Sequence, residues 1–139
     1  MTSLIYNSLV EDIATGAIDL NTDAFKAMLV TDSYTADKDA HTKRSDVTGE
    51  AVGTGYTTGG ATVTATVTKY TATDRVDTVF SNPSWAASTI TARALVIYKS
   101  RGGASADDEL VAYVDFGSNI ASTSGTFAVT LSSPLRFQN

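Results

Sequence analysis

The chain has 139 residues, no cysteine and a formal net charge of −5 at neutral pH. This length fits one domain with a real hydrophobic core, and a chain without cysteine can form no disulfide, thiol nucleophile or thiolate metal site. Its ten Lys and Arg residues are scattered, so it lacks the basic face that binds nucleic acid. No stretch approaches the roughly 20 apolar residues that span a bilayer, and the first residues lack the pattern of a signal peptide. We therefore expect a single β-rich domain, residues 1–139, that binds neither nucleic acid nor membrane.

An amphipathic helix is predicted over about residues 3–15. Its apolar face is formed by residues at a spacing of four, namely Ile5, Leu9 and Ile13. Ser3 is a suitable N-cap, and Gly16 can take the left-handed conformation that ends a helix. A helix of about three turns is marginal alone, so it should dock on a sheet.

The other predicted elements are strands. Short runs rich in β-branched and aromatic residues alternate with Gly, Asn, Asp and Ser, as is typical of antiparallel β proteins. The predicted strands are Phe25–Thr31, a run from Ala61, Asp74–Phe80, Ile90–Tyr98, Leu110–Phe116 and a run through Phe127, Val129 and Leu131. A turn is predicted over Gly117–Gly125. Because no helices alternate with the strands, the predicted fold is mainly β, an antiparallel β-sandwich or flattened barrel with the N-terminal helix packed on it.

Four glycines lie within Gly53–Gly60, just before the run from Ala61. A dinucleotide-binding pattern would need a third glycine at Thr58, no lysine follows as in a phosphate-binding loop, and the next element is a strand. A turn that leads into a strand is therefore favoured over a nucleotide site. In that strand valine and alanine alternate with threonine, which predicts one core face and one threonine face. The predicted core positions are Val63, Ala65 and Val67.

The two most apolar runs, Ile90–Tyr98 and Leu110–Phe116, are predicted to pair as a central hairpin. Placing Arg93 opposite Asp115 sets a register in which opposite charges and apolar residues share one face. The further pairs in this register are Leu95 with Tyr113, Ile97 with Val111, and Lys99 with Glu109. Because the other face is apolar as well, the hairpin should be interior.

Charged residues inside these apolar strands could be mistaken for a reactive site. A cross-strand ion pair that fixes the register explains them better. Arg93 with Asp115, and Lys99 with Glu109, are therefore predicted as structural ion pairs.

The long loop, about residues 32–60, carries many ionisable residues and almost no large apolar ones. A surface excursion of this length is usually functional or contacts a partner. Asp37, Asp39 and His41 have the alternating spacing of cation ligands. However, Thr42 stands where a calcium loop of the EF-hand type needs glycine. A solvated or partner-facing loop is favoured, and no metal site is predicted.

No catalytic residue is predicted. His41 is the single histidine, so any serine–histidine–aspartate triad would have to use it, and the chain has no Gly-x-Ser-x-Gly elbow to present a nucleophile. His41 is most simply an exposed loop residue.

Trp85 and the tyrosines Tyr34, Tyr56 and Tyr70 are candidates for an aromatic binding surface. A tryptophan beside a proline more often covers one end of a sandwich, which is the favoured interpretation of Trp85, while the tyrosines stay candidates for interface anchors. The predicted interface residues are Tyr34, His41, Tyr56 and Trp85.

The order of motifs over nearly the whole chain resembles a family of small bacteriophage virion structural proteins. The blocks that carry the resemblance are Leu4–Ser8, Gly16–Leu20, Met28–Thr35, Gly53–Thr62, Ser88–Arg93 with Val96–Lys99, and Ala112–Gly117. The glycine turn and the last two blocks are the most specific. The long loop departs from the pattern, so no binding residue is carried over to it.

The resemblance implies a non-enzymatic component of the virion that needs no cofactor. One role is a capsid decoration or cement protein, which binds and stabilises the capsid lattice. Such proteins are commonly trimeric, so the expected partners are the major capsid protein or other virion proteins and further copies of this chain. The alternative role is a tail or baseplate component with a host-surface or glycan-binding face. An acidic, cysteine-free, threonine-rich β domain with long loops favours the first role.

Overall fold

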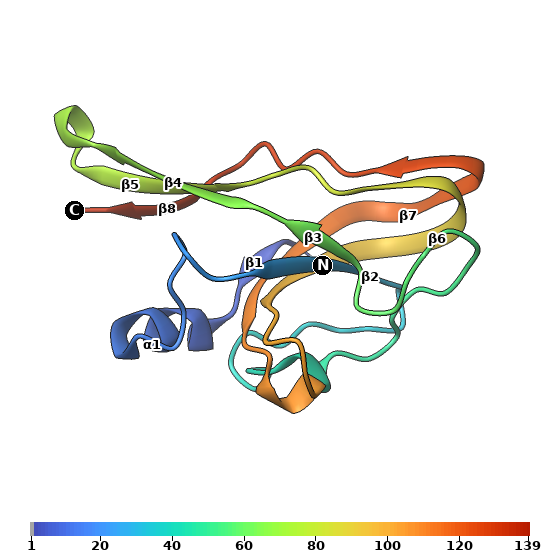
Figure 1. Ribbon diagram of the computed structural model, residues 1–139, viewed down its shortest axis with the longest axis horizontal. Coiled ribbons are helices and arrows are strands. Elements are labelled where there is room, and N and C mark those ends of the chain that lie inside the picture. The colour runs from blue at the N-terminus through green and yellow to red at the C-terminus, as the bar shows by residue number, and fades with distance from the viewer. Residues whose placement is uncertain (1) are drawn as a thin grey trace.

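The computed structural model describes residues 2–139 and contains two antiparallel β-sheets (Figure 1). The large sheet has the order β1 (Leu4–Ile5), β7 (Leu110–Ala128), β6 (Ser84–Lys99), β2 (Phe25–Val30) and β3 (Ala61–Val63). The small sheet has the order β4 (Ala65–Tyr70), β5 (Arg75–Phe80) and β8 (Leu135–Gln138). The helical elements are α1 (Asn7–Thr15) and the 3-10 turns η1 (Arg44–Asp46), η2 (Thr71–Thr73) and η3 (Ser105–Asp107). The predicted fold class, a mainly β antiparallel sandwich with one α-helix near the N-terminus, is confirmed.

The main hydrophobic core lies between the two sheets. Phe25 of β2 and Phe80 of β5 meet edge to face with ring centroids 5.5 Å apart. Trp85, at the start of β6, is 6% exposed and packs against Phe127 of β7. Full burial of a large apolar side chain contributes about 1.5 to 3 kcal/mol, so the contact between Phe25 and Phe80 helps to hold the two sheets face to face.

The opposite face of the large sheet is also covered. Met28 and Val30 of β2 and Val96 of β6 point into a second cluster that includes Tyr34 and Ala36 of the long loop. Figure 1 shows the cyan part of this loop below the large sheet and away from the small sheet, whereas Ala51 and Tyr56, later in the loop, contact the core between the sheets. The hairpin is therefore interior, as predicted, while the expected solvated loop is instead partly buried against the sheet.

The predicted helix begins too early. Leu4 and Ile5 form β1 and pair with Tyr113 and Ala112 of β7, and the helix begins only at Asn7. Ser3 is not the N-cap, because its hydroxyl accepts the main-chain N–H of Asp115. The end of the helix is as predicted, since Gly16 has a φ of 81° in the left-handed region.

The predicted register of the hairpin is wrong by one residue over most of its length. Leu95 lies opposite Val114 and Val96 opposite Tyr113, and only Tyr98 with Leu110 keeps the expected pairing. The cause is an irregularity at Val111, which has no partner between the pairs Ile97–Ala112 and Tyr98–Leu110. An extra residue of this kind is a β-bulge, and it shifts every later pair by one.

The hairpin is also longer than predicted. The segment expected as a turn, Gly117–Gly125, belongs to β7 and pairs with β6, for example Ala92 with Ile120 and Ser88 with Gly125. Three residues of β7 beyond the regular count are taken up between the pairs Ala94–Asp115 and Ala92–Ile120. The glycine and the polar residues that suggested a turn therefore lie in irregular strand.

The run from Ala61 is divided between the two sheets rather than forming one strand. β3 ends at Val63, and the chain crosses at Thr64 into β4 of the small sheet. Val63 is 2% exposed, whereas Val67 is 36% exposed. Val67 is therefore not a core residue, which corrects the expectation drawn from its alternation with threonine.

Candidate functional site

Arg93 and Asp115 form an ion pair, with Nε of Arg93 3.0 Å from Oδ1 of Asp115. Asp115 lies directly opposite Ala94, and Arg93 occupies the irregular position beside it, so the pair is diagonal rather than directly cross-strand. The main-chain N–H of Gly117 also donates to Oδ1 of Asp115. The hydrogen bond from Arg93 holds the pKa of Asp115 below its ordinary value. The two residues bind each other tightly where the strands depart from regular pairing.

Lys99 and Glu109 do not form the predicted side-chain pair. Their main chains are adjacent, with the N–H of Lys99 2.8 Å from the carbonyl of Glu109. Nζ of Lys99 instead donates to the carbonyl of Ala17 at 2.6 Å and lies 2.9 Å from Asp23. The correct neighbours on the strands were thus predicted, but the long lysine side chain reaches the segment after α1.

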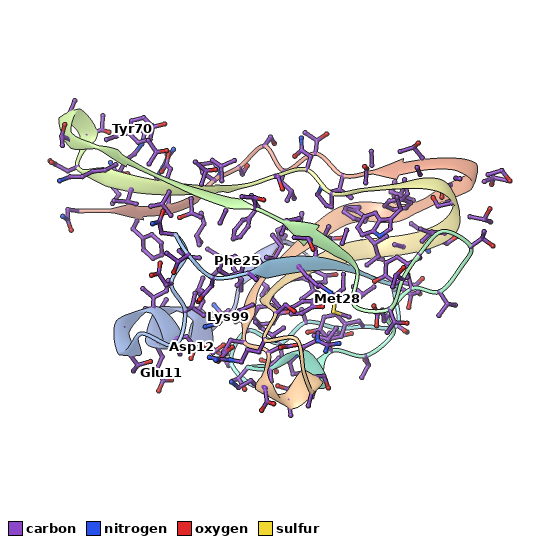
Figure 2. All side chains as sticks on the ribbon, in the orientation of Figure 1. Glu11, Asp12, Phe25, Met28, Tyr70 and Lys99 are labelled. Atoms are coloured by element: carbon purple, nitrogen blue, oxygen red, sulfur yellow. The ribbon has the colours of Figure 1, made fainter. Side chains whose placement is uncertain are left out.

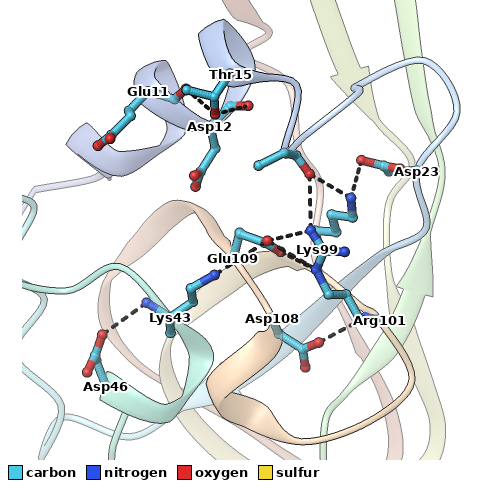
Figure 3. A network of polar contacts seen from close by, with 11 residues as sticks. Glu11, Asp12, Thr15, Asp23, Lys43, Asp46, Lys99, Arg101, Asp108 and Glu109 are labelled. Atoms are coloured by element: carbon cyan, nitrogen blue, oxygen red, sulfur yellow. Dashed lines mark hydrogen bonds and ion pairs between the residues drawn. The ribbon is translucent and has the colours of Figure 1, made fainter.

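Glu109 is at the centre of a charged network (Figure 3), which we call the hinge network. Its members are Lys43, Arg44, Arg101, Asp108 and Glu109. The carboxylate of Glu109, 5% exposed, accepts hydrogen bonds from Arg101 and lies 3.4 Å from Nζ of Lys43. The neighbouring Asp108 accepts from Nε of Arg44 and from the main-chain N–H of Arg101. The hinge network therefore ties η1 of the long loop to the end of the β6–β7 hairpin.

Electrostatics within the hinge network act in two directions. Burial would raise the pKa of Glu109, but the hydrogen bonds from Arg101 and the charge of Lys43 outweigh it and hold this pKa below its ordinary value. Asp12 on α1 faces the same region, and burial together with the negative charge of Glu109 raises its pKa. Lys43, Arg44 and Arg101 are each paired with a carboxylate, so the arrangement braces the loops.

Tyr34 and His41 lie in a hydrogen-bonded chain that begins at Tyr6. The hydroxyl of Tyr6 is 2.9 Å from that of Tyr34, which is 3.0 Å from Nδ1 of His41. Tyr34 is only 4% exposed. Burial raises the pKa of Tyr34, as it does for Tyr6, so both hydroxyls stay protonated. Tyr34 is therefore not an exposed anchor, which corrects that prediction. His41 is partly exposed, and its ring is held by Tyr34 and by the main-chain N–H of Asp37.

Tyr56 and Trp85 are likewise structural. The Tyr56 hydroxyl donates to Glu50 at 2.7 Å and accepts the N–H of Leu29 at 3.1 Å, which fixes the glycine turn against β2. The rings of Tyr56 and Trp85 are in contact at 5.8 Å between centroids. As predicted, Trp85 packs into one end of the sandwich, whereas Tyr56 is partly exposed.

The acidic part of the long loop satisfies its own main chain. Oδ1 of Asp37 accepts the N–H groups of Asp39 and Ala40, which holds the pKa of Asp37 below its ordinary value. Across residues 2–139 no group of three or more His, Asp or Glu side chains is placed to hold a metal ion.

The surface that the sequence did not reveal is the small sheet. We call its residues, 65–80 and 135–138, the arm. Figure 1 shows the arm extending beyond α1, and Figure 2 shows Tyr70 near its end. The eight large apolar residues exposed in the described chain include four on the arm, namely Val67, Tyr70, Val79 and Phe137. A hollow at the end of the arm is lined by Tyr70, Arg75, Val76, Phe137 and neighbouring residues.

Both faces of the arm carry apolar groups. Val67 and Phe137 are on the face that continues the sandwich core, whereas Val79 and Tyr70 are on the outer face, as the cross-strand pairs require. On the outer face Arg136 binds Asp77 through two hydrogen bonds of 2.8 and 3.0 Å. Each face of this protruding sheet thus exposes two large apolar side chains, which a protein partner could cover, so the arm is the candidate functional site.

The chain matches no protein-family model, no curated protein and no solved structure. No helix within residues 2–139 is both long enough and apolar enough to cross a membrane.

Proposed function

We propose that this protein is a non-enzymatic structural component of a bacteriophage virion, and that it decorates and stabilises the capsid lattice. The observation that carries the proposal is the arm, a protruding sheet with Val79 47% exposed on one face and Phe137 37% exposed on the other. Apolar side chains exposed on a protruding sheet suit a protein that packs between neighbouring subunits. The motif blocks that resemble virion proteins support the same role.

The hinge network and the hydrogen-bonded chain of Tyr6, Tyr34 and His41 support this role because they stabilise the fold. They hold the long loop and the hairpin end in fixed positions. A force on the arm at a contact would therefore be passed to a part of the chain that is itself braced. The proposed partners are the major capsid protein or other virion proteins, together with further copies of this chain.

The test adds purified protein to capsids that lack it and measures binding by co-sedimentation and capsid resistance to heat. Wild type should bind and raise the temperature at which capsids break. Val79→Glu should weaken binding at least about tenfold, because it places a desolvated charge in the contact.

The matched control is Val10→Glu on α1, where the valine is 62% exposed and lies outside the arm. This variant should bind like wild type. Failure of wild type to bind capsids, or equal binding by both variants, would contradict the proposal.

A tail or baseplate role with glycan recognition is the second candidate, favoured by the hollow at the end of the arm. Tyr70 is 42% exposed there, beside Arg75 at 4.6 Å from its ring centroid. An exposed aromatic ring with adjacent hydrogen-bonding groups suits the apolar face of a sugar. Binding to host cells or a glycan array, lost in Tyr70→Ala, together with no binding to capsids would select this role.

A further inference from the structure

β4 is an edge strand of the arm, because its one neighbour in the small sheet is β5. All residues from Thr66 to Tyr70 are exposed. Strand edges of this kind offer unpaired main-chain N–H and C=O groups to another strand.

β4 carries one feature by which proteins block such edges, the charged Lys69, and lacks the others. It contains no proline, and its six pairs with β5 run from Ala65–Phe80 to Tyr70–Arg75 without a bulge. Lys69 is its one charged residue. Natural edge strands that must stay single are generally short, bulged, proline-containing or more highly charged, so β4 is suited to receive a partner.

The hydrogen bonds of the small sheet define which groups face outward. The N–H of Ser81 donates to the carbonyl of Thr64 at 2.9 Å, so the main-chain groups of Thr64 face β5. In an antiparallel ladder these orientations alternate. The main-chain groups of Ala65, Val67 and Lys69 therefore face away from β5.

Those three residues are spaced so that β4 complements itself. When two copies of β4 run antiparallel with Val67 opposite Val67, Ala65 of each copy lies opposite Lys69 of the other. Each of the three pairs then joins residues whose main-chain groups face the partner strand, and the two Val67 side chains cover each other. If the register shifts so that Val67 lies opposite Lys69, one of the three pairs is lost. A further shift of two residues would place Lys69 opposite Lys69, and the repulsion between like charges disfavours that register.

Charge opposes a second copy less at the arm than on the rest of the chain. The arm contains three of the ten basic residues and two of the fifteen acidic residues, so its side chains sum to +1 while the rest of the chain sums to −6. Pairing through β4 joins the least acidic parts of two molecules and keeps their acidic bodies apart.

We propose that two copies of this chain pair through antiparallel β4 strands, with Val67 on the two-fold axis, to give a continuous six-stranded sheet. The pairing uses the strand edge, whereas the proposed capsid contact uses the outer face of the arm, so either can fail without the other. Because the contact is two-fold, a trimer would require a different surface.

The first test measures molar mass by size-exclusion chromatography with light scattering, at concentrations up to about 0.5 mM, where pairs of modest affinity are populated. Wild type should be a dimer, and Val67→Lys should weaken it at least tenfold because it opposes two like charges at the axis. Val79→Lys, on the central strand of the arm, should remain a dimer. Circular dichroism checks that both variants are folded.

A second test reports the register directly and needs no change in mass. Because the chain has no cysteine, Val67→Cys introduces a single thiol. Two such residues would have Cα atoms about 5.5 Å apart, within disulfide range, so oxidation should link the dimer. In Lys69→Cys the thiols would be four residues apart along the strands, about 14 Å, and should not link.

A wild type that stays monomeric throughout this range, or an oligomer that Val67→Lys leaves intact, would overturn the pairing. Equal cross-linking of the two cysteine variants would overturn the register. Monomeric protein that still binds capsids would reject this pairing and leave the proposed function standing.

Discussion

Arg93 and Asp115 place a charged pair where the strands of the central hairpin are irregular. The guanidinium is 28% exposed and the carboxylate 5% exposed. A carboxylate removed from water depends on its charged partner, while apolar residues at both positions would remove the desolvation cost together with the attraction.

We therefore expect Arg93→Met alone to lower the thermal unfolding midpoint more than the double change Arg93→Met with Asp115→Leu. The measurement is the midpoint at neutral pH by calorimetry. A double variant no more stable than the single one would show that the pairing does not account for both charges.

Gly60 shows a second residue-scale constraint. Its φ is 82°, and a Cβ there would lie 1.9 Å from the carbonyl oxygen of Ala27. Gly16 has a similar φ of 81° but no atom within 4 Å of the corresponding position. Both glycines relieve backbone strain, but only Gly60 also permits close contact between two main chains.

Gly16→Ala should therefore cost about 1 to 2 kcal/mol of unfolding free energy, the price of a left-handed residue with a side chain. Gly60→Ala should cost more than about 4 kcal/mol, beyond the usual range for single substitutions. Chemical denaturation of the two variants checks the difference, and equal costs would mean that β2 moves freely away from the glycine turn.

At the scale of elements, the hinge network joins the long loop to the hairpin end. Asp12 of α1 faces this network, and its pKa is shifted in the opposite direction to that of Glu109. The pKa of Glu109 lies below its ordinary 4.5, so ionised Glu109 stabilises the fold above that pH, and this stabilisation is lost as pH falls through the lowered pKa. The pKa of Asp12 is raised, so folding favours its protonated form, and stability is lost as pH rises through the raised pKa.

Asp12→Asn should consequently raise the unfolding midpoint at pH 7, and this gain should vanish below the ordinary Asp pKa of 3.8. Glu109→Gln should lower stability at pH 7 by about 1 to 2 kcal/mol, because Arg101 and Lys43 lose an ionised partner. Thermal melts of both variants between pH 3 and pH 7 measure these effects. A loss of stability in Asp12→Asn at pH 7 would contradict the assigned direction.

The elements were predicted better than their boundaries and register. Alternation and apolar content identified β2, β5 and both arms of the hairpin, because local pattern is enough to define a strand. Ile5 fitted the apolar face of a helix equally well, and only the pairing of Leu4 and Ile5 with β7 makes this segment a strand. The bulge at Val111 leaves no mark in residue type, so charge matching placed Arg93 near Asp115 but could not give the register.

At the scale of the molecule, the candidate site depends on where strands lie rather than on what they contain. Val63 and Val67 occupy equivalent places in the same alternation, yet the crossing at Thr64 buries one and exposes the other. Tyr34 and Trp85 were singled out for aromatic character, which is as useful in a core as at an interface. The arm could be recognised only once the two sheets were in place.

The chain passes between the sheets at three places, at Thr64, at Ser81–Pro83 and at 129–134. Each strand of the arm is thus the direct continuation of a strand in the large sheet. A force on the arm is shared by three covalent connections, which lead into β3, β6 and β7. The hydrogen bonds of these strands must break before a strand separates from the large sheet. The small sheet should therefore resist a force applied along its strands.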